Sequence, residues 1–415
     1  MTQRAIDRML VRRFVIAGAT ATALFAVTAG PASSVPAACR NTGNFAAWLD
    51  QFKKEAAAQG ISPAAITAAS PYMVLDQRII NIDRGQKVFG QPFLEFSDRM
   101  AAAYRVQGGA TQIRKHAAIF QRAEQQYGVP PAVIAAFWAL ESDFGASQGK
   151  YQIIPSVTTL AYDCRRPDMF RKHLFDMLRL LQRGDLAPAE MIGSWAGELG
   201  QTQMMPSEYF KYAVDYDGDG RRNLLRSPAD VIGSTANYIA NLGWKRGEPW
   251  LQEVRVPPSL AWDQADLAIK HPRAQWVKWG VTFADGRPLP ADNLQASLLL
   301  PMGRFGPAFL AYANFDVYLT WNNSLVYSTT AGYLATRIAG APPMHRGSGA
   351  IPSFSGEQAK ELQLLLIAQG HDVGGADGKI GLATRAAIKK VQMKYGLPAD
   401  SYPTVELLAR LRAGR

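Results

Sequence analysis

An almost wholly apolar helix that ends in a glutamate constrains this chain more than any other feature. Residues 130–140 begin with Pro130 and Pro131, which pre-set a helix start, and nearly every side chain after them is apolar. A helix that is apolar on all sides is buried in a protein core. The sequence therefore predicts a central helix with Glu141 in its last turn and Gly145 as its stop.

The pKa of Glu141 is predicted to be raised. Burial disfavours the charged carboxylate, and the negative end of the helix dipole acts in the same direction. A carboxyl group that is protonated near neutral pH can serve as a general acid. The alternative is a structural carboxylate that pairs with an arginine or caps a neighbouring helix, because ion pairs also shift pKa values.

A turn rich in glycine and glutamine accompanies this helix. It runs from Gly197 to Pro206 and is followed by Tyr209 and an acidic stretch at 213–220. With Glu141 and its flanking residues, this order of motifs resembles the lytic murein transglycosylases of the membrane-bound lytic transglycosylase B-like family, over roughly residues 40 to 340. The resemblance implies a mainly α (α+β) chain with a lysozyme-like helical catalytic core, and a lyase that cleaves the glycan strands of peptidoglycan.

The chemistry that the resemblance implies needs a single acid/base and no cofactor. Glu141 protonates the oxygen between N-acetylmuramic acid and N-acetylglucosamine, then accepts the proton of the muramyl C6 hydroxyl as that oxygen attacks C1. A 1,6-anhydromuramyl end results. Most glycosidases use two carboxylates, and Asp143, two helical positions on, should point elsewhere. One alternative is a hydrolytic muramidase that uses Glu198, and another is a noncatalytic peptidoglycan-binding protein.

The resemblance also implies which residues hold the sugar chain. The amides of Gln201 and Gln203 suit sugar hydroxyls, and Trp321 stands where a tyrosine is common, so that stacking on sugar is kept. Two adjacent arginines match a pair that faces lactyl and peptide carboxylates, for which a guanidinium fork is suited. The alternative for the turn is a packed loop without ligand contact. The implied substrate-binding residues are Ser194, Gln203, Met204, Arg165, Arg166, Tyr238, Trp321, Asn322 and Tyr327.

The acidic stretch resembles the opening of a calcium loop of EF-hand type. Carboxylates alternate from Asp215 and a glycine stands sixth, but Arg226 occupies the twelfth position, where a bidentate glutamate is expected. Asp230 is the nearest residue that could close the loop. The alternative is an acidic turn paired with neighbouring arginines. The predicted ligands of a structural Ca²⁺ are Asp215, Asp217, Asp219, Arg221 and Asp230.

The N-terminal residues predict export. Four arginines precede an apolar run at 14–29, and small residues continue to Ala38, as in a secretory signal that is cleaved. We therefore expect a periplasmic protein; the alternative is a membrane anchor, for which the run is short. The two cysteines, Cys39 and Cys164, predict one disulfide in an oxidising compartment, with buried free thiols as the alternative.

The formal net charge of +11 first suggests a nucleic-acid partner. The arginines are dispersed, however, and no nucleic-acid-binding motif is present, so we predict no such partner. Peptidoglycan is a polyanion on which a basic protein accumulates, and its glycan strands are the predicted partner. Weak membrane association is compatible with this charge, and we expect a monomer.

Residue spacing predicts the order of elements. Helices are expected at 45–60, 94–106 and 110–127, and again within 155–245, then at 308–312 and 324–338. Alternation at 251–256 and the run 276–283 predict strands in a small β-rich insertion at about 247–300. The expected division is a signal peptide at 1–38, a catalytic domain at 39–340, a linker at 341–354 and a C-terminal domain at 355–415, whose motif around Asp377, Gly381 and Thr384 resembles three-helix peptidoglycan-binding domains.

Overall fold

The computed structural model describes residues 43–85, 91–351 and 353–414. The predicted signal segment and Cys39 lie outside these residues. Helices dominate what is described, so the predicted mainly α class is confirmed. Within the described ranges, no helix combines the length and the apolar character needed to cross a membrane.

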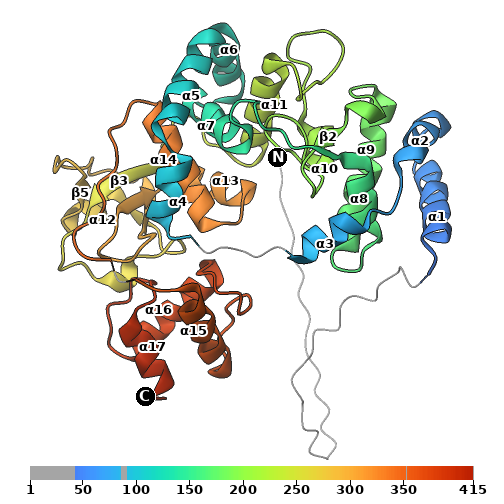
Figure 1. Cartoon of the computed structure of the whole chain (residues 1–415). Coiled ribbons are helices and arrows are strands. Elements are labelled where there is room, and N and C mark those ends of the chain that lie inside the picture. The colour runs from blue at the N-terminus through green and yellow to red at the C-terminus, as the bar shows by residue number, and fades with distance from the viewer. Residues whose placement is uncertain (1–42, 86–90, 352, 415) are drawn as a thin grey trace, which may run out of the picture. The chain divides into compact units, whose positions relative to one another are not determined.

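Helix α7 (Pro131–Ser142) lies at the centre of the largest apolar cluster, and its side chains from Ala132 to Leu140 are all buried. It packs against four other helices, as Figure 1 shows. These neighbours are α5 (Ala103–Lys115), α6 (Ala117–Tyr127), α11 (Pro228–Asn241) and α14 (Leu325–Ile338). The prediction of a buried central helix is confirmed.

The remaining helices before the tail extend this core. Helices α8 and α9 pack on each other, α10 packs on α9 and α11, and α13 and α4 pack on α14. Their bounds are α1 (Phe45–Ala58), α2 (Pro63–Ala69), α3 (Gln77–Gly85), α4 (Phe93–Met100), α8 (Ile153–Tyr162), α9 (Pro167–Arg183), α10 (Pro206–Tyr212) and α13 (Ala313–Trp321). Breaks at 101–102 and at His116 divide the stretches predicted as continuous helices at 94–106 and 110–127.

An antiparallel five-stranded sheet forms a second apolar cluster, with strand order β4-β6-β7-β3-β5. Leu251 pairs with Ala311 and Val254 pairs with Ala308. The strands and the helix among them are β3 (Leu251–Arg255), β4 (His271–Pro272), α12 (Arg273–Lys278), β5 (Thr282–Phe283), β6 (Gln295–Leu299) and β7 (Ala308–Ala311). A separate two-stranded pair joins β1 (Tyr151–Gln152) to β2 (Ile192–Gly193).

Two predictions in this region are wrong. Residues 308–311 form the central strand β7 rather than a helix, and all four are buried, so their unbroken apolar run lacked the alternation that marks a half-exposed strand. Residues 273–278 form helix α12, and only Thr282 and Phe283 of the predicted strand 276–283 are in the sheet. The sheet therefore extends beyond residue 300, the predicted end of the insertion.

The C-terminal helices have an apolar cluster of their own. They are α15 (Gly356–Ala368), α16 (Leu382–Lys394) and α17 (Val405–Arg412). Arg385, 9% exposed, donates a hydrogen bond to the Leu300 carbonyl at 2.7 Å. The segment before these helices is also bound, since the Ser348 amide donates to the Phe305 carbonyl at 2.9 Å. The segment predicted as a linker thus makes a specific contact with the loop between β6 and β7.

Candidate active site

The end of α7 differs from the prediction. The helix ends at Ser142, not at Gly145, because Asp143 and Phe144 both adopt left-handed backbone conformations, with φ of 49° and 59°. Left-handed non-glycine residues are uncommon and carry strain, which tertiary contacts must offset. Arg105 supplies such a contact through a two-pronged ion pair with the Asp143 carboxylate, at 2.6 and 3.0 Å. Asp143 thus points away from Glu141, as predicted.

The glycine- and glutamine-rich turn is fastened to this helix end by Gln201. Its side-chain oxygen accepts a hydrogen bond from the Trp138 indole at 2.8 Å, and its side-chain nitrogen donates to the Leu225 carbonyl at 2.9 Å. The Ser142 hydroxyl donates to the Gln201 carbonyl at 2.5 Å. The amide of Gln201, expected to contact sugar, is therefore used inside the protein, and it brings the two sequence motifs together.

Glu141 lies between two aromatic donors. The Trp321 indole N–H donates to its Oε1 at 2.9 Å, and the Tyr327 hydroxyl donates to the same oxygen. Burial raises the pKa of Glu141 to about 7, although both hydrogen bonds act in the opposite direction, and the charge of Glu198 raises it further. The carboxyl group is thus poised to give and to recover a proton at neutral pH. The predicted pKa shift agrees in direction and in main cause.

Aromatic rings line this side of α7. Trp321, the last residue of α13, stacks on Phe137 with ring centroids 4.2 Å apart. Tyr238 on α11 lies 5.1 Å from the Trp321 ring and stacks on Tyr212 at 4.7 Å. Phe137 covers one face of the Trp321 ring. Trp321 also contacts Glu141, and its stacking on the glycan stays a prediction.

Ser194 and Glu198 form a hydrogen-bonded pair, and the charge of Glu198 acts on Glu141. The Ser194 hydroxyl donates to the Glu198 carboxylate and accepts from the Ala196 amide at 3.1 Å. Gln203 has a φ of 48° and donates its side-chain amide to the Gly200 carbonyl at 2.8 Å. Both predicted residues thus lie in the turn that Gln201 anchors, and both contribute hydrogen bonds that shape it.

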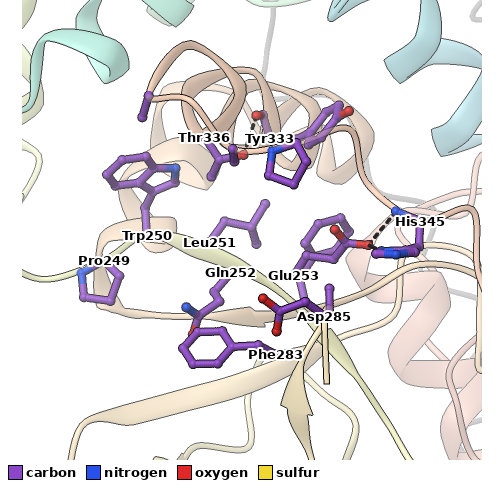
Figure 2. Close-up of a pocket in the computed structure, with 15 residues that line it drawn as sticks. Pro249, Trp250, Leu251, Gln252, Glu253, Phe283, Asp285, Tyr333, Thr336 and His345 are labelled. Atoms are coloured by element: carbon purple, nitrogen blue, oxygen red, sulfur yellow. Dashed lines mark hydrogen bonds and ion pairs between the residues drawn. The ribbon is translucent and has the colours of Figure 1, made fainter. Parts of the chain in front are cut away.

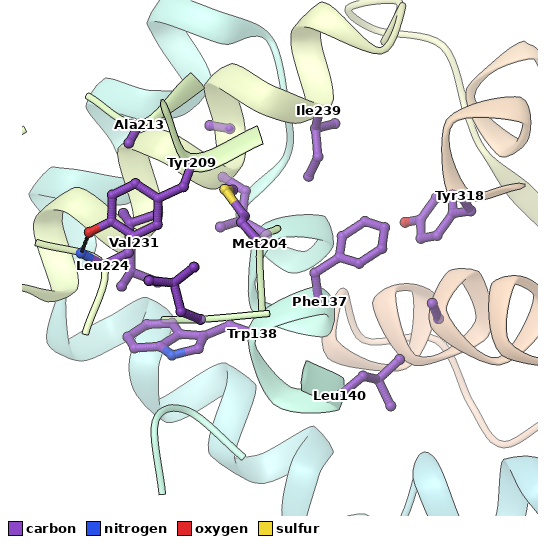
Figure 3. Close-up of a cluster of buried hydrophobic side chains, with 14 of the residues drawn as sticks. Phe137, Trp138, Leu140, Met204, Tyr209, Ala213, Leu224, Val231, Ile239 and Tyr318 are labelled. Carbon is purple, nitrogen blue, oxygen red and sulfur yellow. Dashed lines mark hydrogen bonds between the residues drawn. The ribbon is translucent and has the colours of Figure 1, made fainter. Parts of the chain in front are cut away.

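Two residues predicted to line the cleft have mainly internal contacts. Met204 is only 2% exposed and packs in the core with Trp138 and Tyr209, as Figure 3 shows. Its apolar side chain packs the turn onto the core. The side-chain oxygen of Asn322 accepts the Ser324 amide at 2.9 Å, just before α14 begins. These contacts were not predicted from the sequence, and the role of both residues in lining the cleft stays a prediction.

The predicted arginine pair is bound to a residue that the sequence did not single out. Arg165 and Arg166 both form ion pairs with Asp83 of α3, whose side chain is 1% exposed. Arg84 similarly binds Asp163. The side chains of Arg165 and Arg166 remain 49% and 38% exposed. Asp83 fixes their orientation.

The acidic loop brings three of its five predicted ligands together. Oxygens of Asp215, Asp217 and Asp230 lie within 4.8 Å of one another. Burial raises the pKa of the Asp230 carboxyl, and the charges of Asp217 and Asp215 add to the shift. Asp219 is not in the group; it accepts the Arg221 amide at 2.8 Å, and the Arg221 guanidinium donates to the Asp185 carbonyl. Three convergent hard oxygen donors suit Ca²⁺.

Only one of the two cysteines of the predicted disulfide lies in the described part of the chain. Cys164 is not a free thiol. Its predicted partner, Cys39, lies outside the described residues, so this pairing stays a prediction.

A separate pocket of about 380 Å³ lies between the sheet and the second half of α14. Figure 2 shows Trp250, Glu253, Phe283 and Tyr333 around it, with Glu253 bound to His345. Glu141 and Tyr327 are not among its lining residues. This pocket is therefore distinct from the candidate active site.

Sequence reasoning missed several residues around Glu141. Tyr104 is 57% exposed and donates to Asp143 at 3.3 Å, and Arg105 holds the same carboxylate. Asp83 binds the arginine pair. No local motif marks these residues, because each acts on a partner that is distant in sequence.

Families and relatives with similar sequences cover most of this chain. The sequence model of the Transglycosylase SLT domain matches residues 44–336, and that of a peptidoglycan binding domain matches residues 355–411. The membrane-bound lytic murein transglycosylase B of Escherichia coli (strain K12) is 32% identical over 254 residues, which are 60% of this chain and 67% of that protein.

Solved structures extend the likeness. The crystal structure of SltB3 from Pseudomonas aeruginosa, in complex with NAG-anhNAM-pentapeptide, is 40% identical with a TM-score of 0.82, and the match covers 89% of this chain and 99% of that one. The Escherichia coli lytic transglycosylase Slt35 in complex with calcium is 28% identical with a TM-score of 0.60, covering 70% of this chain and 92% of that one. The predicted lysozyme-like fold is confirmed, and the chain belongs to the Transglycosylase SLT domain family, the lytic transglycosylases of peptidoglycan.

Proposed function

We propose that the protein is an exported lytic transglycosylase that cleaves the MurNAc-GlcNAc β-1,4 bond and closes a 1,6-anhydroMurNAc ring, with Glu141 as its single acid/base. The observation that carries this proposal is the carboxyl group of Glu141, which burial brings to a pKa of about 7 at the end of a buried helix. A noncatalytic binding protein would have no need for a proton donor of this kind.

Each step needs only this carboxyl and the substrate. Protonated Glu141 donates to the glycosidic oxygen as the C1–O bond breaks, and the N-acetylglucosamine side leaves as an alcohol. The muramyl C6 oxygen then bonds to C1 and its proton passes to the Glu141 carboxylate. The acid is regenerated and water is not consumed. A pKa near the working pH serves both transfers, because the group must be acid in one and base in the next.

A hydrolytic muramidase is the second candidate, and Glu198 is the observation in its favour. The negative charge of Glu198 raises the pKa of Glu141, and its carboxylate could act as the general base that activates a water. The Ser194 hydroxyl, however, donates to the Glu198 carboxylate and accepts from the Glu198 backbone amide, so that both residues are bonded to each other within one small turn. This supports a structural role for Glu198 and favours the transglycosylase.

The products released from purified sacculi distinguish the two candidates. We expect mass spectrometry to find muropeptides lighter by one water than those from a hydrolase, with few reducing muramyl ends. Glu198→Gln should keep the anhydro product, since it leaves the acid/base in place. Reducing ends as the main product, abolished by Glu198→Gln, would instead establish the muramidase.

We also propose how the remaining predicted residues take part. Ser194, Gln203 and Tyr238 border the site, and the partly exposed side chains of Arg165 and Arg166 offer guanidinium groups for substrate carboxylates. Residues 1–38 would direct export to the periplasm, and residues 355–415 would bind peptidoglycan, which the family match at 355–411 supports. The boundaries at 340 and 354 belong to this proposal.

A structural Ca²⁺ at Asp215, Asp217 and Asp230 is a further part of the proposal. The three carboxylates converge, and the related Slt35 structure is a complex with calcium. Bound ion would offset the repulsion among these charges and hold the loop that precedes α11.

Calcium is expected to stabilise the protein against heat. At a concentration 100 times its Kd, an ion that binds only the folded state adds about 2.7 kcal/mol to the free energy of unfolding. Thermal unfolding with Ca²⁺ and with EDTA measures this, with Mg²⁺ for comparison. Asp217→Asn should remove the calcium effect and Asp219→Asn should keep it, because Asp219 is outside the convergent group. An equal Tm with and without Ca²⁺ would contradict the site.

A further inference from the structure

The two oxygens of the Glu141 carboxyl group have different surroundings. Both hydrogen bonds, from Trp321 and from Tyr327, fall on Oε1. Within the described part of the chain, no protein group donates to Oε2. One oxygen is thus occupied by protein donors, while the other is left for exchange with a ligand.

The two donors differ in what they can do when Glu141 changes its protonation state. An indole N–H can only donate, whereas a tyrosine hydroxyl can donate or accept. The Tyr327 hydroxyl could therefore reverse its hydrogen bond, but Trp321 cannot. A proton placed on Oε1 would weaken the bond from Trp321, because the hydroxyl oxygen of a carboxylic acid accepts less well than its carbonyl oxygen.

The indole is fixed to the same helix that carries Glu141. Phe137 and Glu141 are four residues apart on α7, so their side chains lie on one face of the helix. The Trp321 ring stacks on Phe137 at 4.2 Å and an interplanar angle of 28°, and its N–H reaches Glu141 at 2.9 Å. Tyr238 packs on the indole from α11. Side-chain packing thus fixes the direction of the N–H donor.

We propose that Trp321 is a positioning residue that binds Oε1 of Glu141 permanently, so that Oε2 carries the proton which the reaction transfers. This inference rests on the proposed role of Glu141 as the acid/base. It explains why a donor-only side chain stands at this position. During turnover Oε2 would lose and regain the proton without rotation of the carboxyl group, because Oε1 keeps its contact in both states.

The test compares Trp321→Phe and Trp321→Tyr with Trp48→Phe. Trp48 is a matched control, since it is a half-buried tryptophan whose indole N–H has no partner among the described residues. Phenylalanine at 321 keeps an aromatic ring for Phe137 but removes the donor, and tyrosine offers a hydroxyl as a donor. The measurements are kcat and KM on a soluble glycan fragment, and the pH dependence of kcat/KM.

We expect Trp321→Phe to lower kcat by about 10- to 100-fold, as for loss of a hydrogen bond to a charged group, with a much smaller change in KM. The donor stabilises the carboxylate, so its loss raises the pKa of Glu141 and moves the basic limb of the pH profile up by about one pH unit. Trp321→Tyr should recover part of kcat, and Trp48→Phe should match the wild type.

A raised KM with unchanged kcat in Trp321→Phe would overturn the inference and support Trp321 as a sugar platform. An unmoved basic limb would also overturn it, since a purely structural role would lower activity without shifting the pH profile. Failure of the proposed function is a separate result. If the proposed function is wrong, the wild-type enzyme will release reducing ends. The positioning of Glu141 by Trp321 could still be measured in that case, from kcat and the pH profile of Trp321→Phe.

Discussion

Glu141→Gln is expected to lower kcat by about 100- to 10,000-fold, the range in which general acid–base catalysis contributes. Glutamine has nearly the shape of glutamate, and its side-chain oxygen can still accept from Trp321 and Tyr327. It cannot give up and recover a proton. The fold and glycan binding should therefore persist while turnover stops, which circular dichroism and a sedimentation assay with sacculi can check.

The same substitution should make the protein more stable above neutral pH. The pKa of Glu141 is about 7 in the folded protein against an ordinary 4.5. Below pH 4.5 the carboxyl group is neutral in the folded and in the unfolded protein, so its burial does not lower the free energy of unfolding. Between pH 4.5 and 7 the unfolded protein ionises first and the free energy of unfolding falls. Above pH 7 this loss is complete. This difference corresponds to roughly 3 kcal/mol at most. The variant should match the wild type near pH 4 and exceed it at pH 8 by roughly 1–3 kcal/mol in the free energy of unfolding.

Glu208→Gln is a suitable control. Burial also raises the pKa of Glu208, and one of its carboxyl oxygens has no hydrogen-bond partner within the described ranges. This variant should gain stability in the same direction but keep turnover, since Glu208 is not among the groups that shift the pKa of Glu141 or donate to it. Substantial turnover by a folded Glu141→Gln variant would remove Glu141 from the mechanism.

The environment of Glu141 was predictable because it depends on local sequence. An apolar helix between residues 130 and 141 must be buried, and burial is the main cause of the raised pKa. The helix stop was not predictable in the same way. Asp143 ends α7 in a left-handed conformation because Arg105, on another helix, binds its carboxylate. In the sequence, Gly145, two residues after Asp143, was the stronger indication of a helix end.

The roles of polar residues in the turn depended on distant partners and could not be predicted. Gln201 and Gln203 look alike in sequence, yet the first is buried and bonded to Trp138, while the second is half-buried and donates to the carbonyls of Gly200 and Gln148. The sequence predicted that the aromatic ring of Trp321 stacks on sugar, but only the structure shows that Phe137 stacks on this ring. For strand β7, burial on both faces removed the alternation that would have distinguished it from a helix.

Gln201→Leu is expected to lower the free energy of unfolding by roughly 1–3 kcal/mol, because it leaves the buried indole N–H of Trp138 without a partner. That N–H donates to the Gln201 side-chain oxygen at 2.8 Å, whereas the Leu225 carbonyl, which Gln201 binds at 2.9 Å, keeps a second hydrogen bond from Gln148 at 3.1 Å. Leucine fills a similar volume, so the loss should come from hydrogen bonding and not from a cavity.

The same variant should lose activity, by about tenfold or more, because the turn that carries Ser194 and Gln203 is positioned relative to Glu141 through Gln201 and small misplacements are costly in catalysis. Urea denaturation and kcat on a soluble fragment measure the two effects. Gln182→Leu is the control: its exposed amide oxygen accepts only the Ser62 amide at 2.7 Å, so water can replace the contact. A Gln201→Leu variant that unfolds at the wild-type urea concentration would mean that other contacts, such as that between Ser142 and the Gln201 carbonyl, are sufficient to join the turn to α7.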